Sequence, residues 1–162
     1  MPAGRPRWRT DHQLWVELFV LLNFAGLVGD IYLAHSQNRF HRASEYIPLY
    51  FSMAATVILA VVLLVKERWG YLAPWRDAGY LVGWLAVTVG LTGVILHLDS
   101  QFFAARTLKS LTYAAPFAAP LAYTGLGFLL IVNRMVDASS VDWARWVLWM
   151  ALGGFAGTLS SA

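Results

Sequence analysis

Five side chains of the kinds that bind metal ions lie in two short stretches of the chain. His35, His41 and Glu45 fall in the first stretch, and His97 and Asp99 fall in the second. Imidazoles mixed with carboxylates suit zinc or non-haem iron, and imidazoles also bind copper. We therefore expect these residues to form a metal site, provided that the fold brings the two stretches together.

A haem is the second cofactor that these histidines suit. His97 follows a stripe of small residues, against which a flat macrocycle could lie, and His35 could supply the other axial ligand. The cofactors compatible with the ligands are zinc, iron, copper and haem b. Neither the His41/Glu45 spacing nor the His97/Asp99 spacing is a specific motif. Ordinary polar residues at a membrane surface would give the same pattern.

A different chemistry would depend on Asp30 and Asn23, which lie inside a long apolar run. A carboxylate within a membrane is costly and usually faces the interior of a helix bundle, where it has a partner. Arg39, Arg42 or Arg106 could be that partner. The two polar residues could line a route for ions or protons. The alternative is a structural hydrogen bond from Asp30 to carbonyl groups freed by prolines in a later apolar run.

The sequence contains no recognisable set of catalytic residues. It has no cysteine, which excludes cysteine nucleophiles, iron–sulfur clusters and disulfides. It also has no Walker-type loop, no GxSxG motif and no dinucleotide-binding fingerprint. We therefore expect a protein without catalytic activity of its own.

The composition indicates that the elements carrying these residues lie in a membrane. The chain is 59% hydrophobic and 13% charged, whereas soluble domains are about 25% charged. Apolar runs of about 20 residues can cross a bilayer as helices. Five such runs are Leu14–Ala34, Ile47–Val65, Gly79–His97, Leu111–Val132 and Trp143–Ala162. We predict an all-α protein, a single domain over residues 1–162 that forms a bundle of five transmembrane helices.

The distribution of Lys and Arg predicts the orientation of this bundle. The side of the N-terminal tail carries eight of the twelve Lys and Arg residues: seven lie in the tail and in the second and fourth connections, and Arg145 lies near the start of the fifth run. Because cytoplasmic segments are enriched in these residues, we expect the N-terminus inside and the C-terminus outside. We attribute the net charge of +3 to basic residues that set the orientation in the membrane. The expected partner is therefore the lipid bilayer, and no binding of nucleic acid is expected. In a bacterium the location would be the cytoplasmic membrane. We expect Glu17, near the inner boundary, to reach the lipid headgroups.

Small residues at spacings of three and four predict where the helices pack. They are Gly83, Gly90 and Gly93 in the third run, and Gly153 and Gly157 in the fifth. The first run has a stripe of polar and small residues that should also be buried, and it contains Asn23 and Asp30. The second run, rich in valine and leucine, is expected to face lipid all round. Five helices cannot bury every such stripe, so we expect a homo-oligomer or a complex with other membrane subunits.

Three functions are compatible with these patterns. The first is a non-catalytic subunit that holds a metal or a haem at the extracytoplasmic face of a larger membrane complex, such as an electron-transfer complex. The second is a scaffold or accessory subunit without a cofactor. The third is a small ion or proton transporter that uses Asp30 and Asn23. The first hypothesis requires the first and third helices to end at the same side of the membrane.

Overall fold

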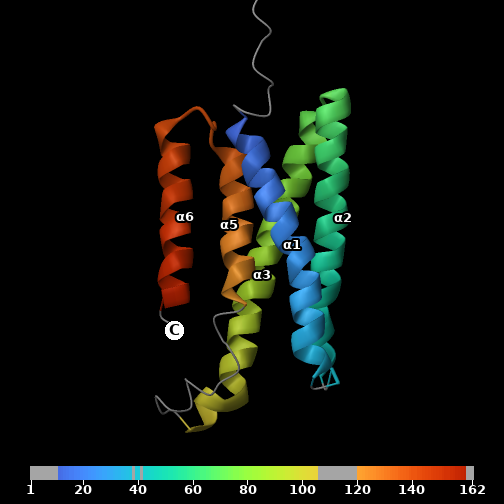
Figure 1. Cartoon of the computed structure of the whole chain (residues 1–162), viewed down its shortest axis with the longest axis vertical. Coiled ribbons are helices and arrows are strands. Elements are labelled where there is room, and N and C mark those ends of the chain that lie inside the picture. Colours follow the sequence, from blue (N-terminus) through green and yellow to red (C-terminus); the bar gives the residue numbers. More distant parts are fainter. Residues whose placement is uncertain (1–10, 38, 41, 106–119, 160–162) are drawn as a thin grey trace, which may run out of the picture.

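The computed structural model of the chain describes residues 11–37, 39–40, 42–105 and 120–159. Within these ranges the fold is all-α. The five helices are α1 (His12–Ser36), α2 (Tyr46–Trp69), α3 (Leu72–Ala105), α5 (Leu121–Met135) and α6 (Val141–Leu159), with a short 3-10 turn, η2 (Ala43–Glu45), before α2. The helices lie along a common long axis (Figure 1).

Among the described residues, three segments are long and apolar enough to cross a membrane, as a multi-pass membrane protein requires. They are His12–Ser36, Ala43–Trp69 and Leu72–Asp99. Helix α5 is also apolar, but it has 15 residues and measures roughly 22 Å at about 1.5 Å per residue. This is shorter than the hydrocarbon core of about 30 Å. Residues 111–119 of the fourth predicted span lie outside the described residues, so the arrangement of five spans stays a prediction.

Four of the helices form a ring, and the fifth lies outside it. Helices α1, α2, α3 and α5 each pack against two neighbours in that cyclic order, and α6 packs on the far side of α5 (Figure 1). Helices α1 and α3 run in the same direction and end at the same end of the bundle, while α2 and α5 run the opposite way. The ring therefore brings the start of α1 and the end of α5 together.

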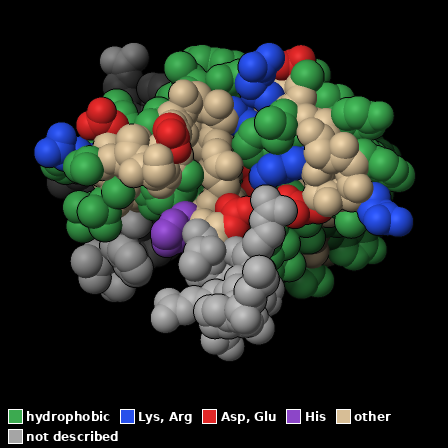
Figure 2. Space-filling model, turned by 90° about the horizontal axis from the view of Figure 1, so that it is seen from above, with side chains coloured by type: hydrophobic (Ala, Val, Ile, Leu, Met, Phe, Trp, Pro, Cys, Tyr) green, Lys and Arg blue, Asp and Glu red, His purple; other side chains and the backbone are tan. Residues whose placement is uncertain are grey.

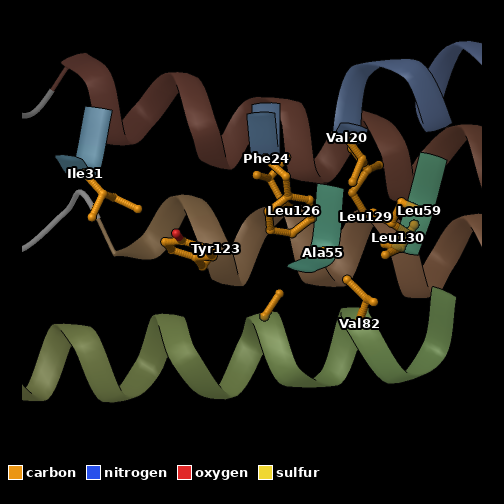
Figure 3. Packing of buried hydrophobic residues seen from close by; sticks show 11 residues of the cluster. Val20, Phe24, Ile31, Ala55, Leu59, Val82, Tyr123, Leu126, Leu129 and Leu130 are labelled. Carbon is orange, nitrogen blue, oxygen red and sulfur yellow. The ribbon is translucent and has the colours of Figure 1, made fainter. Parts of the chain in front are cut away.

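The core of the ring contains aromatic rings surrounded by aliphatic side chains (Figure 3). The Phe24 ring lies 5.8 Å from that of Phe51 and 6.0 Å from that of Tyr123, measured between centroids. The hydroxyl of Tyr123 donates a hydrogen bond to the Pro48 carbonyl oxygen (3.0 Å) and also contacts the Ser52 hydroxyl. The polar atom of this buried tyrosine is thereby satisfied, as burial requires.

The expectation that the second span faces lipid all round is wrong. Helix α2 buries Ser52, Ala55, Leu59 and Leu63, which follow one another at spacings of three and four along one face. The valines and leucines of the segment lie on both its buried and its exposed faces, so its hydrophobicity could not reveal the buried one. The two small residues mark that face.

Helices α3 and α5 approach each other most closely, because glycines line the contact. A Cβ atom added to Gly90 would lie 2.8 Å from the carbonyl oxygen of Pro120, and one added to Gly83 would lie 3.0 Å from that of Gly127. A Cβ atom on Gly93 would lie 2.8 Å from the Pro120 side chain. Such distances leave no room for a larger residue. The close contact fixes the register between the two helices.

Candidate functional site

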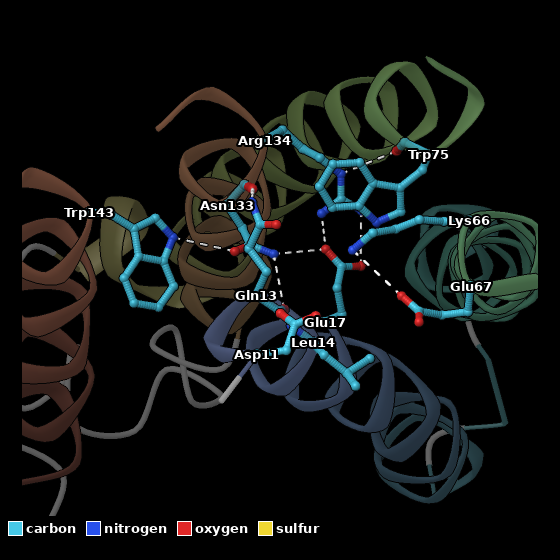
Figure 4. A network of polar contacts seen from close by, with 10 residues as sticks. All are labelled: Asp11, Gln13, Leu14, Glu17, Lys66, Glu67, Trp75, Asn133, Arg134 and Trp143. Atoms are coloured by element: carbon cyan, nitrogen blue, oxygen red, sulfur yellow. Dashed lines mark hydrogen bonds and ion pairs between the residues drawn. The ribbon is translucent and has the colours of Figure 1, made fainter. Parts of the chain in front are cut away.

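A buried cluster of polar side chains lies where α1 begins and α5 ends (Figure 4). Glu17 of α1 is 2% exposed, and Asn133 and Arg134 of α5 are 0% and 7% exposed. The side chain of Asp11 accepts a hydrogen bond from the amide of Leu14 (3.0 Å). It thereby caps the N-terminus of α1, so that the helix is already formed where Glu17 meets α5.

Glu17 and Arg134 form an ion pair in this cluster. The Arg134 Nη2 donates to Glu17 Oε2 (2.9 Å), and Nη1 contacts Oε1, so the guanidinium holds both carboxylate oxygens. The Nε of Arg134 donates to the Trp75 carbonyl oxygen (3.1 Å), and its guanidinium carbon lies 3.7 Å from the centre of the Trp75 ring. Such two-point pairing is the strong form of a charge-assisted hydrogen bond. It joins α1, α3 and α5.

Asn133 extends the cluster to α6. Its Nδ2 donates to Glu17 Oε1 (2.8 Å), and its Oδ1 accepts from the indole nitrogen of Trp143 (3.3 Å). Its backbone carbonyl accepts from the side chain of Gln13 (3.2 Å). One amide side chain therefore connects helices α1, α5 and α6 at the same level.

The short connection between α5 and α6 positions Trp143. The Asp137 carboxylate accepts hydrogen bonds from the backbone amide of Ser139 (2.9 Å) and from its hydroxyl (2.8 Å). These bonds stabilise the charged form and lower the pKa of Asp137. The hydroxyl of Ser140 then accepts from the amide of Trp143 (3.1 Å), which caps the start of α6.

Lys66 of α2 completes the cluster. Its ammonium nitrogen lies 4.4 Å from the centre of the Trp75 ring and 3.7 Å from the Glu67 carboxylate. Two cations thus lie over one indole, and each is paired with a carboxylate. Together with the bond from Trp143 to Asn133, the contacts of the cluster join all five described helices. The prediction that Glu17 reaches the headgroups is wrong, because Arg134 offers it a closer partner inside the bundle. The cluster is chemically suited to fixing helices in place.

Charged groups of both signs lie across this end of the molecule, and hydrophobic side chains surround them at the rim (Figure 2). Such a distribution fits a membrane–water boundary, where polar groups are hydrated and the rim contacts lipid.

Two of the five predicted metal ligands lie together at the opposite end. The Nδ1 of His35 is 3.4 Å from Oε2 of Glu45, and Glu45 Oε1 also accepts from the Arg42 amide (3.3 Å). The ring of Phe40 lies 6.0 Å from that of His35 and stacks on Tyr46 at 4.5 Å. A histidine and a carboxylate are thus close to each other beside an aromatic stack.

The other three predicted ligands are not joined to this pair in the described structure. His97 and Asp99 lie on α3, and the ends of α1 and α3 are apart (Figure 1). His41 lies outside the described residues. Among the residues that are described, no group of three or more His, Asp and Glu side chains could hold a metal ion. The metal and haem hypotheses therefore stay predictions.

Asn23 and Asp30 lie on the outer face of α1, in contrast to the expectation that they are buried. Larger apolar residues of the same helix, such as Phe24, occupy the core instead. The Nδ2 of Asn23 donates to the Phe19 carbonyl oxygen (2.8 Å). Asp30 makes no hydrogen bond or ion pair within the described residues, and Arg106, one expected partner, lies outside them.

Glycines accompany the two polar residues on this outer face. A Cβ atom added to Gly26 or Gly29 would meet nothing within 4 Å. By contrast, Gly83, Gly90 and Gly93 are covered by α5. Gly153 and Gly157 lie in α6, and their surroundings fall outside the described part. We use the term α1 outer face for Leu22, Asn23, Ala25, Gly26, Gly29, Asp30 and Leu33, all of which are exposed.

Comparisons of the chain with protein-family models, with curated proteins and with solved structures found no match.

Proposed function

We propose that the chain is a non-catalytic multi-pass membrane subunit that joins a larger membrane assembly through the α1 outer face. The observation that carries this proposal is the exposed carboxylate of Asp30 in a helix long enough to span a membrane. A carboxylate facing hydrocarbon is costly, and such residues normally pair with a group on a neighbouring helix. Since the bundle leaves Asp30 on its outside, we propose that the neighbour is another membrane protein chain.

The buried charges support a structural role over transport or catalysis. Glu17 is held by Arg134 and Asn133, so its carboxylate is engaged in fixing helices. The transport hypothesis depended on Asn23 and Asp30 lining a route between helices. Their positions on the outside of the bundle favour an assembly surface instead.

The proposed arrangement in the bilayer has five spans, with the N-terminus inside and the C-terminus outside. The cluster around Glu17 and Arg134 would then lie near the cytoplasmic boundary, and the His35 and Glu45 pair near the outer boundary. The Lys and Arg distribution supports this orientation.

Photo-cross-linking in native membranes tests the assembly. A photoreactive amino acid in place of Gly26 should yield a covalent adduct with protein. The matched control places the same group at Val57, which is 63% exposed on α2, and it should yield adducts with lipid. Adducts with lipid alone at both positions would contradict the proposal.

A second function is favoured by the 3.4 Å contact between His35 and Glu45. We propose that these side chains, with His41, His97 and Asp99, hold zinc, iron, copper or haem b at the outer face of the complex. Metal analysis and an absorption spectrum of the detergent-purified protein test this. Bound metal or haem should be lost in His35→Ala and kept in His12→Ala, whose imidazole lies at the other end of α1. A metal-free, colourless and folded wild-type protein would refute it.

A further inference from the structure

We infer that the partner at the α1 outer face is a transmembrane helix of a different protein, and that this helix carries a lysine or an arginine within its apolar span. This inference rests on the proposed function and names the chemistry of the partner. Asp30 needs a cation at its own depth in the membrane, and the spans of this chain do not supply one there.

Asp30 lies at a depth where hydrocarbon surrounds α1. The middle residue of α1 is Phe24, and Asp30 follows it by six residues, which is about 9 Å along the axis. Half the thickness of a hydrocarbon core of about 30 Å is about 15 Å. With α1 centred in the bilayer, the backbone of Asp30 therefore lies about 6 Å inside the core.

The side chain of Asp30 points away from the nearer headgroups. In an α-helix the Cα–Cβ bond is tilted towards the N-terminus of the helix. Asp30 belongs to the last two turns of α1, so its side chain leads back towards the middle of the membrane. Its carboxylate also lacks the long stem with which lysine and arginine reach the membrane surface. The carboxylate therefore stays at membrane depth, where it needs a partner.

The basic residue that follows α1 does not pair with Asp30 within one copy. The amide of Arg39 donates to the Ser36 carbonyl oxygen (3.0 Å), which places Arg39 beyond the last turn, on the side from which the Asp30 side chain points away. The two residues form no ion pair in the part of the chain that the structure describes. Ionisable residues at membrane depth normally pair with one another, so Asp30 requires a cation from outside the bundle.

A second copy of this chain does not bring that cation to the depth of Asp30. The five apolar runs contain a single basic residue, Arg145, which lies near the inner boundary in the proposed arrangement, whereas Asp30 lies near the outer one. Two copies insert in the same orientation, so a contact between their α1 helices would bring the two Asp30 carboxylates together, and like charges repel. The cation therefore belongs to a different protein.

The rest of the α1 outer face suits contact with a helix. No atom lies within 4 Å of an added Cβ on Gly26 or Gly29, and open glycines let the backbone of a second helix come close. One N–H of the Asn23 amide is used by the Phe19 carbonyl oxygen, which leaves its second N–H and its Oδ1 for the partner. Asn23 lies about two turns from Asp30 on the same face, so the partner helix meets two polar groups at that spacing.

The outer face of α2 shows what a lipid-facing surface of this protein contains. From Met53 to Leu64, every exposed residue of α2 is apolar. The α1 outer face differs from it in carrying an amide, a carboxylate and two open glycines at membrane depth. This contrast points to protein, and not lipid, as the neighbour of α1.

Photo-cross-linking in native membranes identifies the segment that covers Asp30. The peptide attached to the photoreactive group at position 26 is sequenced by mass spectrometry. We expect an apolar run of about 20 residues from another protein, with a lysine or an arginine inside it.

The dependence of this adduct on charge is the second measurement. Asp30→Asn keeps the size of the side chain and removes its charge, and it should lower the yield of the adduct about tenfold, a ratio equivalent to about 1.4 kcal/mol. Asp77→Asn is the matched control, because the Asp77 side chain is 69% exposed at the other end of the bundle. This control should give the yield of the unsubstituted chain. Since Asp30 has no partner within the described structure, Asp30→Asn should also keep the melting temperature.

An exchange of charges tests the pair directly. Replacing the basic residue of the identified partner by aspartate should abolish the adduct with Asp30 present. Combining that change with Asp30→Lys should restore it. Failure to restore the adduct, with both proteins present in the membrane, would overturn the inference.

The outcomes separate the inference from the proposed function. If position 26 labels a protein segment without lysine or arginine, or labels a second copy of this chain, the inference is overturned and the proposed function holds. An equal yield from Asp30→Asn and Asp77→Asn would likewise overturn the inference alone. If position 26 labels lipid only, both the inference and the proposed function are overturned.

Discussion

Glu17 and Arg134 are buried charges that satisfy each other within a largely apolar bundle. Removing a carboxylate from water costs several kcal/mol, which only good geometry and further hydrogen bonds can offset. The guanidinium of Arg134 contacts both oxygens of Glu17, and Asn133 donates to one of them. Arg134 has a third partner in the Trp75 carbonyl oxygen. The pair is therefore stable only while all of these groups are present.

The first prediction concerns the loss of one partner. Glu17→Ala should lower the free energy of unfolding by about 3–5 kcal/mol, because Arg134 would remain buried without a counter-charge. Denaturant unfolding in detergent measures this. Glu67→Ala is the control, since Glu67 is 49% exposed and such pairs contribute about 0–1 kcal/mol. Equal losses in the two variants would show that the buried pair carries no special stability.

The second prediction concerns pH. Because Ser139 donates two hydrogen bonds to Asp137, the pKa of Asp137 is below its ordinary value. A carboxylate with a lowered pKa in the folded state adds stability above its unfolded pKa, and this stability is lost as pH falls through the folded pKa. Titration of the carboxyl carbon by NMR should show the low pKa, and Ser139→Ala should raise it in part. An unchanged pKa in that variant would contradict the role of the hydroxyl.

The sequence did not reveal the pairing of Glu17 with Arg134, although each residue could be interpreted separately. The residues are 117 positions apart, and each has an ordinary explanation when considered alone. Glu17 fits a residue near the headgroups, and Arg134 fits a topology signal. The available clue was depth, because both lie near the same predicted boundary on antiparallel spans. Depth alone does not say which way a side chain faces around its helix.

At the scale of the helices, the sequence predicted where a helix begins and ends better than which of its faces is buried. The first predicted span, Leu14–Ala34, differs from α1 (His12–Ser36) by two residues at each end. The sequence could not predict which face of α1 is exposed, because the bulky Phe24 is buried in the core and the polar stripe lies outside. Helix α5 begins at Leu121, directly after Pro120, and a residue without an amide proton is well tolerated at a helix start.

The third prediction concerns the contact of α3 with α5. Gly90→Ala should destabilise the fold by about 1–3 kcal/mol, the usual result of overpacking, because its Cβ would lie 2.7 Å from the amide nitrogen of Thr124. Gly125→Ala, at an open position of α5, should be neutral or slightly stabilising, since alanine favours a helix more than glycine does. Thermal unfolding of the two variants measures the difference. Equal melting temperatures would show that the α3–α5 contact relaxes without cost.

At the scale of the whole molecule, the ring of four helices and the outer helix α6 are joined at one end by the polar cluster. Asn133 contacts Glu17 within the ring and Trp143 outside it. The opposite end has the pair of His35 and Glu45. The sequence predicted that α1 and α3 end at the same side of the membrane, since each crossing reverses the direction of the chain. It could not predict that their ends lie apart, because the order of helices around the ring depends on packing.

The last prediction concerns the number of membrane crossings, which depends on the short helix α5. Single cysteines at Ala43, Tyr71 and Ser139 report on the first, second and fourth connections, because all three residues are exposed and the chain has no cysteine. With five spans and the N-terminus inside, an impermeant maleimide added to intact cells should label Ala43→Cys only. Permeabilised cells should allow labelling of all three, which is the control for reactivity.

If α5 does not cross, Ser139→Cys lies on the side of Ala43→Cys and is labelled in intact cells. That result would show that α5 does not cross the membrane. Labelling of Tyr71→Cys in place of Ala43→Cys would instead reverse the orientation.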